Sequence, residues 1–188
     1  LRNITEPAAL FFSVAKEEML ERTAREIERI FPGVASIGGV GQAYLDKKFF
    51  DEGVTVIAMK ESIRVVADVL EQASVMPIKY IRRLENAIKT VGGERGKTAC
   101  FDICSAGADV RAVTTLSDYL CRRGYDLAGG TSNSEAVACN GKVYKDACAF
   151  FIFKNLKGKI KSYKKNIYVH SKENEKQFMV AEANPTEY

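Results

Sequence analysis

One pattern of predicted elements occurs twice along the chain: strand, helix, glycine, strand, Gly-Gly pair and hairpin. An offset of 91 residues aligns the strands at 8–14 and 99–105. The same offset aligns three glycines of each unit, namely Gly33, Gly38 and Gly39 with Gly124, Gly129 and Gly130. The apolar positions of the two helices do not align at this offset, because Leu20 falls on Arg111 and Ile27 falls on Asp118. The pattern predicts two similar halves, which arose from an old duplication or resemble each other by chance.

In the first half, the apolar run at 8–14 is typical of a buried strand. Residues 16–30 carry apolar side chains at helical spacing and predict an amphipathic helix that ends at Pro32-Gly33. A short strand at 34–37 leads into Gly38-Gly39. Two further apolar runs, 54–59 and 63–69, flank Glu61-Ser62 and predict a hairpin.

After this hairpin, a helix is expected to start at Pro77 and to end at Gly92-Gly93. A strand at 99–104 and a helix over 109–123 follow. Asn140-Gly141 lies between two short strands and is the strongest hairpin signal in the chain. A longer hairpin is expected from 147–154 and 159–169.

These elements predict an α+β fold in which three amphipathic helices pack on β-sheet of about nine or ten strands. Helices outside two stacked sheets are one such arrangement, with two similar β-α-β-hairpin halves. The length of 188 residues fits a single domain, 1–188. Because the chain begins with Leu1, we expect a piece of a longer protein, in which residues 171–188 begin the link to a C-terminal domain.

Composition excludes several classes of protein. No apolar run reaches the 18 or so residues that a membrane-spanning helix needs. The net charge of +4 is too small and too dispersed for a nucleic-acid binder. Five cysteines without a CxxC pair and the single His170 predict no metal site and no cofactor. An odd, scattered set of cysteines is typical of reduced thiols in the cytoplasm.

The two glycine-rich segments are the best candidates for ligand contact. Glycine lets a ligand approach backbone N–H groups closely, which suits a carboxylate, and the hydroxyl and amide side chains of the second segment would select the rest of a small polar molecule. Tight turns or close strand packing explain the same glycines equally well. The predicted ligand-binding residues are Gly38, Gly39, Gly41, Gln42, Gly129, Gly130, Thr131, Ser132 and Asn133.

An enzyme is the competing interpretation. Cys104 or Ser105 could act as a nucleophile where the strand at 99–104 ends. However, Ser105 lacks a Gly-x-Ser-x-Gly motif, and His170 lies far away as the only histidine. We therefore predict that the chain is not an enzyme and that Cys104 is a buried core thiol.

A run of lysines offers a third interpretation. On a strand, Lys157, Lys159 and Lys161 would share one face, which is typical of a solvated edge protected by charge. The same face could instead hold a protein partner.

The order of motifs resembles the N-terminal part of the FIST sensory domain over about residues 8–180. The resemblance rests on the opening strand, on Ile37-Gly38-Gly39 and on four later segments: 126–130 (DLAGG), 140–144 (NGKVY), 146–150 (DACAF) and 165–168 (KNIY). The sequence departs from the family at Gly38-Gly39-Val40, where Gly-Cys-Ser/Thr is usual, and at 102–107, where Asp-Gly-Leu-Ser-Gly is usual.

The resemblance implies an intracellular domain of a bacterial signal-transduction protein. Such a domain would bind a small ligand, an amino acid being one candidate. It would be followed by an output module such as a chemoreceptor, kinase or cyclic-nucleotide module, so chemotaxis is one implied role. The departures at the two motifs leave the identity of the ligand open.

Overall fold

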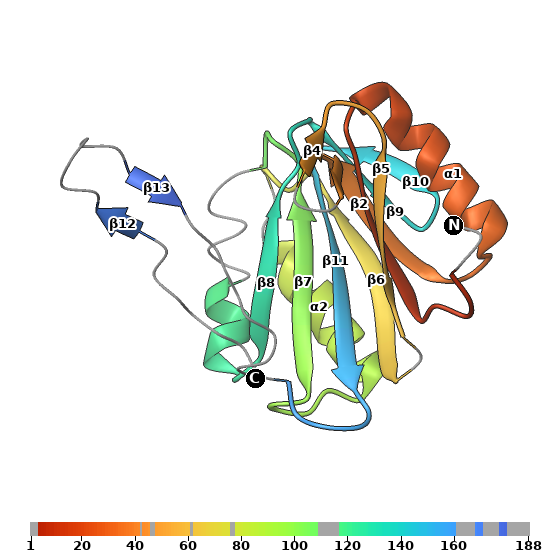
Figure 1. The fold of residues 1–188 in the computed structure, drawn as a ribbon. Helices are drawn as coiled ribbons and strands as arrows, with labels where there is room; N and C mark the ends of the chain where they lie inside the picture. Colours follow the sequence, from red (N-terminus) through yellow and green to blue (C-terminus); the bar gives the residue numbers. More distant parts are fainter. Residues whose placement is uncertain are drawn as a thin grey trace.

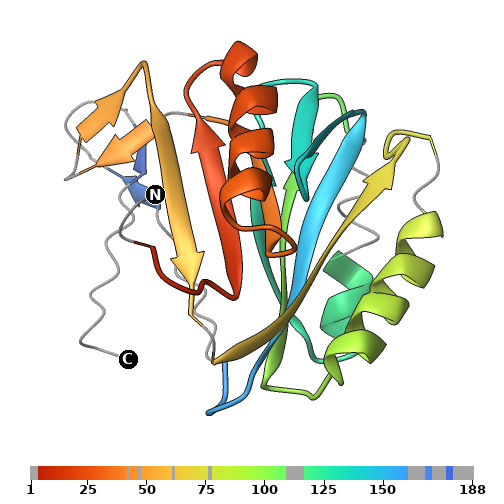
Figure 2. The same ribbon diagram turned by 90° about the vertical axis from the view of Figure 1, so that its right-hand side faces the viewer.

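In a computed structural model of the chain, two mixed β-sheets stack face to face and helices cover their outer faces (Figures 1 and 2). The structure describes residues 4–41, 43–45, 48–60, 62–75, 78–108, 117–160, 168–170 and 177–179. The predicted α+β class and the arrangement of helices outside two stacked sheets are confirmed.

The first sheet has the strand order β10-β9-β2-β1-β5. β1 runs parallel to β2 and antiparallel to β5, and β9 runs antiparallel to β2. Its strands are β1 (Ala9–Val14), β2 (Ala35–Val40), β5 (Val54–Met59), β9 (Ala136–Cys139) and β10 (Lys142–Lys145).

The second sheet has the order β6-β11-β7-β8, in which only β7 and β8 are parallel neighbours. Its strands are β6 (Ile63–Glu71), β7 (Thr98–Cys104), β8 (Asp126–Thr131) and β11 (Ala147–Asn155). Two short ribbons complete the described strands: β3 (Ala43–Leu45) with β4 (Lys48–Phe50), and β12 (Tyr168–His170) with β13 (Gln177–Met179).

The helices are the predicted ones. The helix expected at 16–30 is η1 (Glu17–Met19) followed by α1 (Leu20–Ile30), and the next is α2 (Ile78–Val91). Of the helix expected at 109–123, residues 117–122 are helical and 109–116 lie outside the described residues. Gly33, Gly92 and Gly124 follow the three helices with positive φ angles of 75°, 68° and 74°, the left-handed conformation that ends a helix without strain in glycine.

The predicted repeat is visible in the topology. In the first half, β1, α1 and β2 form a parallel β-α-β unit, and β5 lies on the other side of β1. In the second half, β7 and β8 flank the helical residues 117–122, and β11 lies on the other side of β7. The halves also exchange strands, because β9 of the second half adds to β2 and β6 of the first half adds to β11.

This exchange overturns two predicted hairpins. β5 and β6 do not pair, since they belong to different sheets. β11 does not pair with 159–169, because β6 and β7 already occupy both of its edges; residues 161–167 lie outside the described part. The Asn140-Gly141 hairpin is confirmed. Both turn residues have positive φ, 46° and 77°, as a type I′ turn requires.

Three apolar clusters separate the layers. Leu10, Phe12 and Val14 of β1 pack against α1, whereas Ala9 and Phe11 face the second sheet. The cluster between the sheets also contains Ile37 of β2 and Phe151 of β11. A third cluster lies between the second sheet and α2. Alternating side chains of the inner strands β1 and β7 are therefore buried or half-buried on both faces.

Candidate functional site

Both Gly-Gly pairs lie inside strands, β2 and β8, so the alternative of a tight turn is wrong for them. β2 continues through Gly38 and Gly39, and both are buried. A β-carbon on Gly38 would lie 2.6 Å from three ring atoms of Phe12, and one on Gly39 would lie 2.5 Å from Ile103 Cδ1. These two glycines permit close packing against the neighbouring side chains and leave no open surface for a ligand.

The two glycine-rich segments nevertheless meet. The Val40 N–H donates to Ser132 Oγ at 3.0 Å, and the Asn133 N–H donates to the Val40 carbonyl at 2.8 Å. Ser132 Oγ in turn donates to the Ala136 carbonyl at 2.9 Å. Ser132 is buried, so it acts as a joint between the two sheets, while the Asn133 side chain is exposed. The Gly41 N–H bonds to the Val14 carbonyl; Gln42 lies outside the described residues.

Three of the predicted site residues line a cavity of about 270 Å³ at the carboxyl ends of the parallel strands β7 and β8. Ligands of open α/β sheets commonly bind at such ends. The exposed backbone of Gly129, Gly130 and Thr131 forms one wall. We call this cavity the β7–β8 pocket; its lining is Asp102, Cys104, Ser117, Leu127, Ala128, Gly129, Gly130 and Thr131.

Asp102 is the buried acid of the β7–β8 pocket. Its side chain projects from β7 over the backbone of Gly129, where a β-carbon would lie 1.6 Å from Oδ1. Only 4% of its surface is exposed. Burial raises the pKa of Asp102 to about 7, although its own backbone N–H favours the ionised form. This carboxyl group therefore changes charge near neutral pH.

Sequence reasoning assigned Asp102 no role. The signal available was an acidic residue in the middle of the apolar run from Ala99 to Cys104. An acidic residue in such a run is equally compatible with a functional group and with a solvated strand face. Only its burial in the structure distinguishes the two interpretations.

A disulfide joins Cys104 of β7 to Cys148 of β11, which face each other in the strand register. The expectation of five reduced thiols is therefore wrong for this pair, and Cys104 is not a free core thiol. Its Sγ lies 3.8 Å from Asp102 Oδ2 and carries no proton to donate. Three cysteines are free: Cys100 and Cys139, which are buried, and Cys121, which is exposed.

The nucleophiles of the enzyme interpretation are engaged in structural contacts. Cys104 is oxidised, and the Ser105 hydroxyl, 1% exposed, accepts a hydrogen bond from the Ala147 N–H at 3.1 Å. Within the described ranges, no three His, Cys, Asp or Glu side chains gather as a metal site would require.

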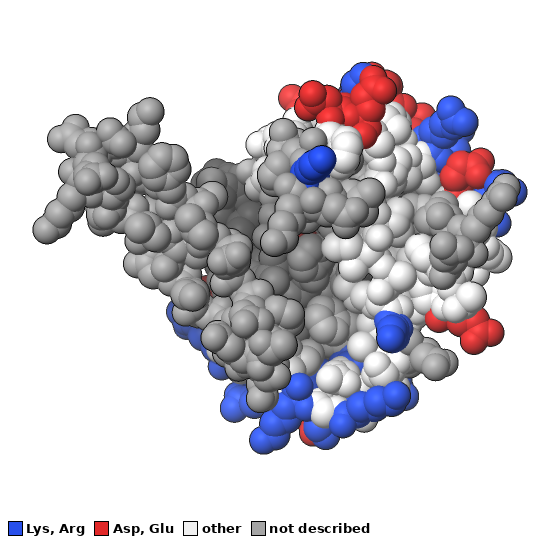
Figure 3. Space-filling model, viewed as in Figure 1, with Lys and Arg blue, Asp and Glu red and all other residues white. Residues whose placement is uncertain are grey.

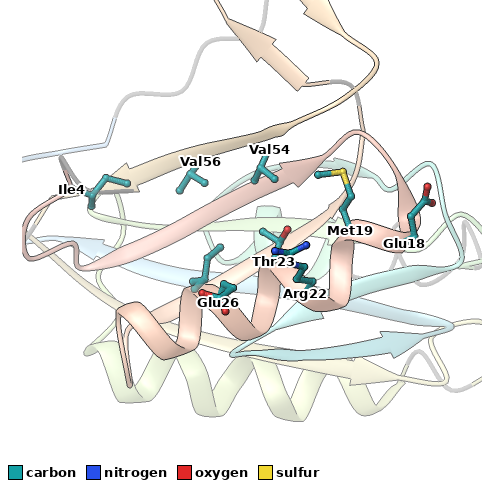
Figure 4. Close-up of a pocket in the computed structure, with 9 residues that line it drawn as sticks. Ile4, Glu18, Met19, Arg22, Thr23, Glu26, Val54 and Val56 are labelled. Carbon is teal, nitrogen blue, oxygen red and sulfur yellow. The ribbon is translucent and has the colours of Figure 1, made fainter.

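A second and larger cavity, of about 750 Å³, lies between α1 and β5 (Figure 4). Met19 of η1 and Thr23 of α1 face Val54 and Val56 of β5 across it. Its charged members are exposed or half-buried, and Glu26 is already paired with Arg29 at 2.8 Å. The described lining of this cavity contains no predicted site residue and no buried polar side chain, so it offers little to select a small polar ligand.

Acidic and basic side chains are mixed near α1, whereas basic side chains gather at the opposite end of the visible face (Figure 3). The predicted basic strand face does not form in the described part, because 157–160 is not a strand. Lys154 bonds to the Gly92 carbonyl at 2.8 Å and pairs with Glu94 at 3.2 Å. Lys161, Lys164 and Lys165 lie outside the described residues.

None of the helices in the described ranges combines the length and the apolar character that crossing a membrane would require. The model of one protein family, described as the FIST N domain, matches residues 8–184. No curated protein sequence is significantly similar to the chain.

Proposed function

Since the chain belongs to the FIST N domain family, a family of sensory domains, we propose that it senses a small ligand in the β7–β8 pocket. The observation that carries this proposal is the pocket itself, which combines a buried ionisable carboxyl group with an open glycine backbone. Polar groups converging on a small cavity are typical of metabolite sites.

The ligand we propose is an amino acid or another small carboxylate. The cavity of 270 Å³ has the volume of about nine water molecules, which limits the ligand to a small metabolite. Gly129 and Gly130 have no side chains to block approach to the backbone, and the exposed Thr131 adds a hydroxyl. Of the nine predicted contacts, these three are the ones we keep.

Signal transmission would start at the end of β8. Thr131 lines the pocket, and the next residue, Ser132, carries the hydroxyl that bonds to Val40 in the other sheet. A ligand that repositions Thr131 would shift this joint and so change the population of sheet arrangements. A following output domain of a signal-transduction protein would read that change.

We further propose that the domain works in the cytoplasm. An exposed free thiol at Cys121 suits a reducing compartment. The disulfide does not contradict this, because Cys104 and Cys148 are at most 2% exposed and are shielded from soluble thiols. Trapping thiols in intact cells with an alkylating agent should find Cys121 reduced; a fully oxidised Cys121 would reject this location.

The FIST family is not known as enzymatic, and we propose a binding function without catalysis. The engagement of Cys104 and Ser105 in structural contacts supports this.

A thermal-shift screen of amino acids, small carboxylates, nucleotides and polyamines tests the function. A ligand at a hundred times its dissociation constant stabilises the folded state by about 2.7 kcal/mol, or roughly 5 to 10 °C for a domain of this size. The hit should weaken in Thr131→Val, which removes a hydroxyl from the pocket. It should persist in Asn133→Ala, whose side chain is exposed outside the pocket. A cooperatively folded protein with no hit would contradict the proposal.

A further inference from the structure

Asp102 is the one buried acidic or basic side chain among the residues that the structure describes. Among these residues, the side-chain atom that approaches the Asp102 carboxyl group is the disulfide sulfur of Cys104, which cannot donate a proton. No Lys or Arg of the described ranges pairs with it. By contrast, the half-buried Asp68 has Arg83 at 2.6 Å, and Asp146 accepts a hydrogen bond from Ser74 at 2.7 Å.

A carboxylate in such a place is costly unless a cation approaches it, because burial removes the water that stabilises its charge. The protein supplies no such cation from its described residues. The carboxyl group lines the β7–β8 pocket, so a bound molecule can supply one.

We propose that Asp102 recognises a protonated amine, so that the β7–β8 pocket selects its ligand by an ammonium group. This inference rests on the proposed function and narrows its ligand class to small amines and amino acids, excluding carboxylates that lack an amine. The ammonium would lie against Asp102, and the remainder of the ligand along Gly129 to Thr131.

A metal ion fits the pocket less well than an ammonium. Hard cations such as Ca²⁺ take six to eight oxygen ligands, several of them carboxylates. The described lining offers the single carboxyl group of Asp102, and no second acid joins it. One carboxylate matches the charge of one ammonium.

Among the described residues, the neighbours of Asp102 do not titrate near neutral pH. The hydroxyl group of Tyr80 in α2 lies 3.9 Å from Cys104 Sγ, and burial raises the pKa of this hydroxyl far above 10. Burial likewise raises the pKa of Cys100, and the disulfide of Cys104 does not ionise. The wall from β8 is Leu127 to Thr131, and Ser117 completes the lining; none of these titrates. Within the described part of the pocket, a change in binding between pH 6 and pH 8 with a non-titrating probe therefore reports Asp102.

The test uses probes that share a carbon skeleton. L-alanine is compared with propionate, which lacks the ammonium, and with ethylamine, which lacks the carboxylate. L-leucine, 4-methylpentanoate and 3-methylbutylamine form a larger set. Binding is followed by NMR titration of the wild type, of Asp102→Asn and of Asp118→Asn. The last variant also removes one negative charge, but from an exposed position outside the pocket.

We expect the amines and amino acids to shift the amide signals of Gly129 and Gly130, and the carboxylates to bind at least tenfold more weakly. Asp102→Asn should weaken amine binding by thirtyfold or more, as expected when a buried charge partner is removed, and Asp118→Asn should not. Wild-type affinity should fall up to tenfold per pH unit below about 7, which tests the inference even if Asp102→Asn fails to fold.

Equal binding of propionate and alanine at the pocket would overturn the inference, as would amine binding that is independent of pH. So would the absence of any response to amines. A carboxylate that binds there and depends on Thr131 would overturn the ammonium inference and leave the sensor function standing. Failure of the whole ligand screen would reject the function itself.

Discussion

The carboxyl group of Asp102 occupies the space that a side chain at Gly129 would need. A β-carbon at position 129 would lie 1.6 Å from Asp102 Oδ1 and 2.6 Å from the Asp102 carbonyl oxygen. The two residues face each other in the parallel register of β7 and β8. The glycine is thus a requirement of the buried acid, and not of a turn.

Gly129→Ala should therefore destabilise the fold by about 1 to 3 kcal/mol, because overpacking displaces Asp102 or separates the two strands. Gly130→Ala is the matched control, since a β-carbon there meets no atom within 4 Å. Urea denaturation measures both variants. Equal stability of the two would show that Asp102 does not fill this space.

Ser132→Ala should cost about 1 to 3 kcal/mol, because it leaves the buried Val40 N–H without its acceptor. Asn133→Ala, next to it but with an exposed side chain, should change stability little. Thermal unfolding compares the two. A Ser132→Ala variant as stable as wild type would contradict the joint between the sheets.

The stability of the ligand-free protein should depend on pH through Asp102. Burial raises its pKa from 3.8 to about 7, so the folded state binds more protons than the unfolded state between these values. The free energy of unfolding then falls as pH rises from 4 to 7, by roughly 4 kcal/mol, and changes little above that range. Asp102→Asn should flatten this slope in urea denaturation at pH 5 and pH 8. An unchanged slope would place the titrating group elsewhere.

Counting thiols tests the disulfide. Alkylation of the native protein should modify Cys121, and alkylation after denaturation without reductant should modify three cysteines, since Cys100 and Cys139 become accessible. Reduction should raise the count to all five. Because the bond closes a loop of 44 residues, its loss should destabilise the fold by about 4 kcal/mol. Five reactive thiols in the unreduced, denatured protein would contradict the pairing.

The helices, the Asn140-Gly141 turn and the α+β class could be predicted because each depends on local spacing. Apolar residues at helical intervals define α1 and α2, and the favoured turn pair defines the β9–β10 hairpin. Strand pairing depends on contacts between distant residues. Nothing local indicates that β6 adds to β11 and β9 to β2, and two hairpins were therefore predicted wrongly.

The site was predicted in part for the same reason. A Gly-Gly pair after an apolar run is equally compatible with a turn and with a strand whose glycines make room for a side chain that is distant in the sequence. Phe12, Ile103 and Asp102 decide between them at Gly38, Gly39 and Gly129. The disulfide could not be predicted from the sequence, because Cys104 and Cys148 come together only when β11 pairs with β7.

The decisive measurement maps where a ligand from the screen binds, from the NMR amide shifts that it causes in the full chain. We predict that the largest changes occur at Gly129, Gly130 and Thr131 and extend through Ser132 to Val40. Changes centred on Met19, Val54 and Val56 would instead place the ligand between α1 and β5 and contradict the account.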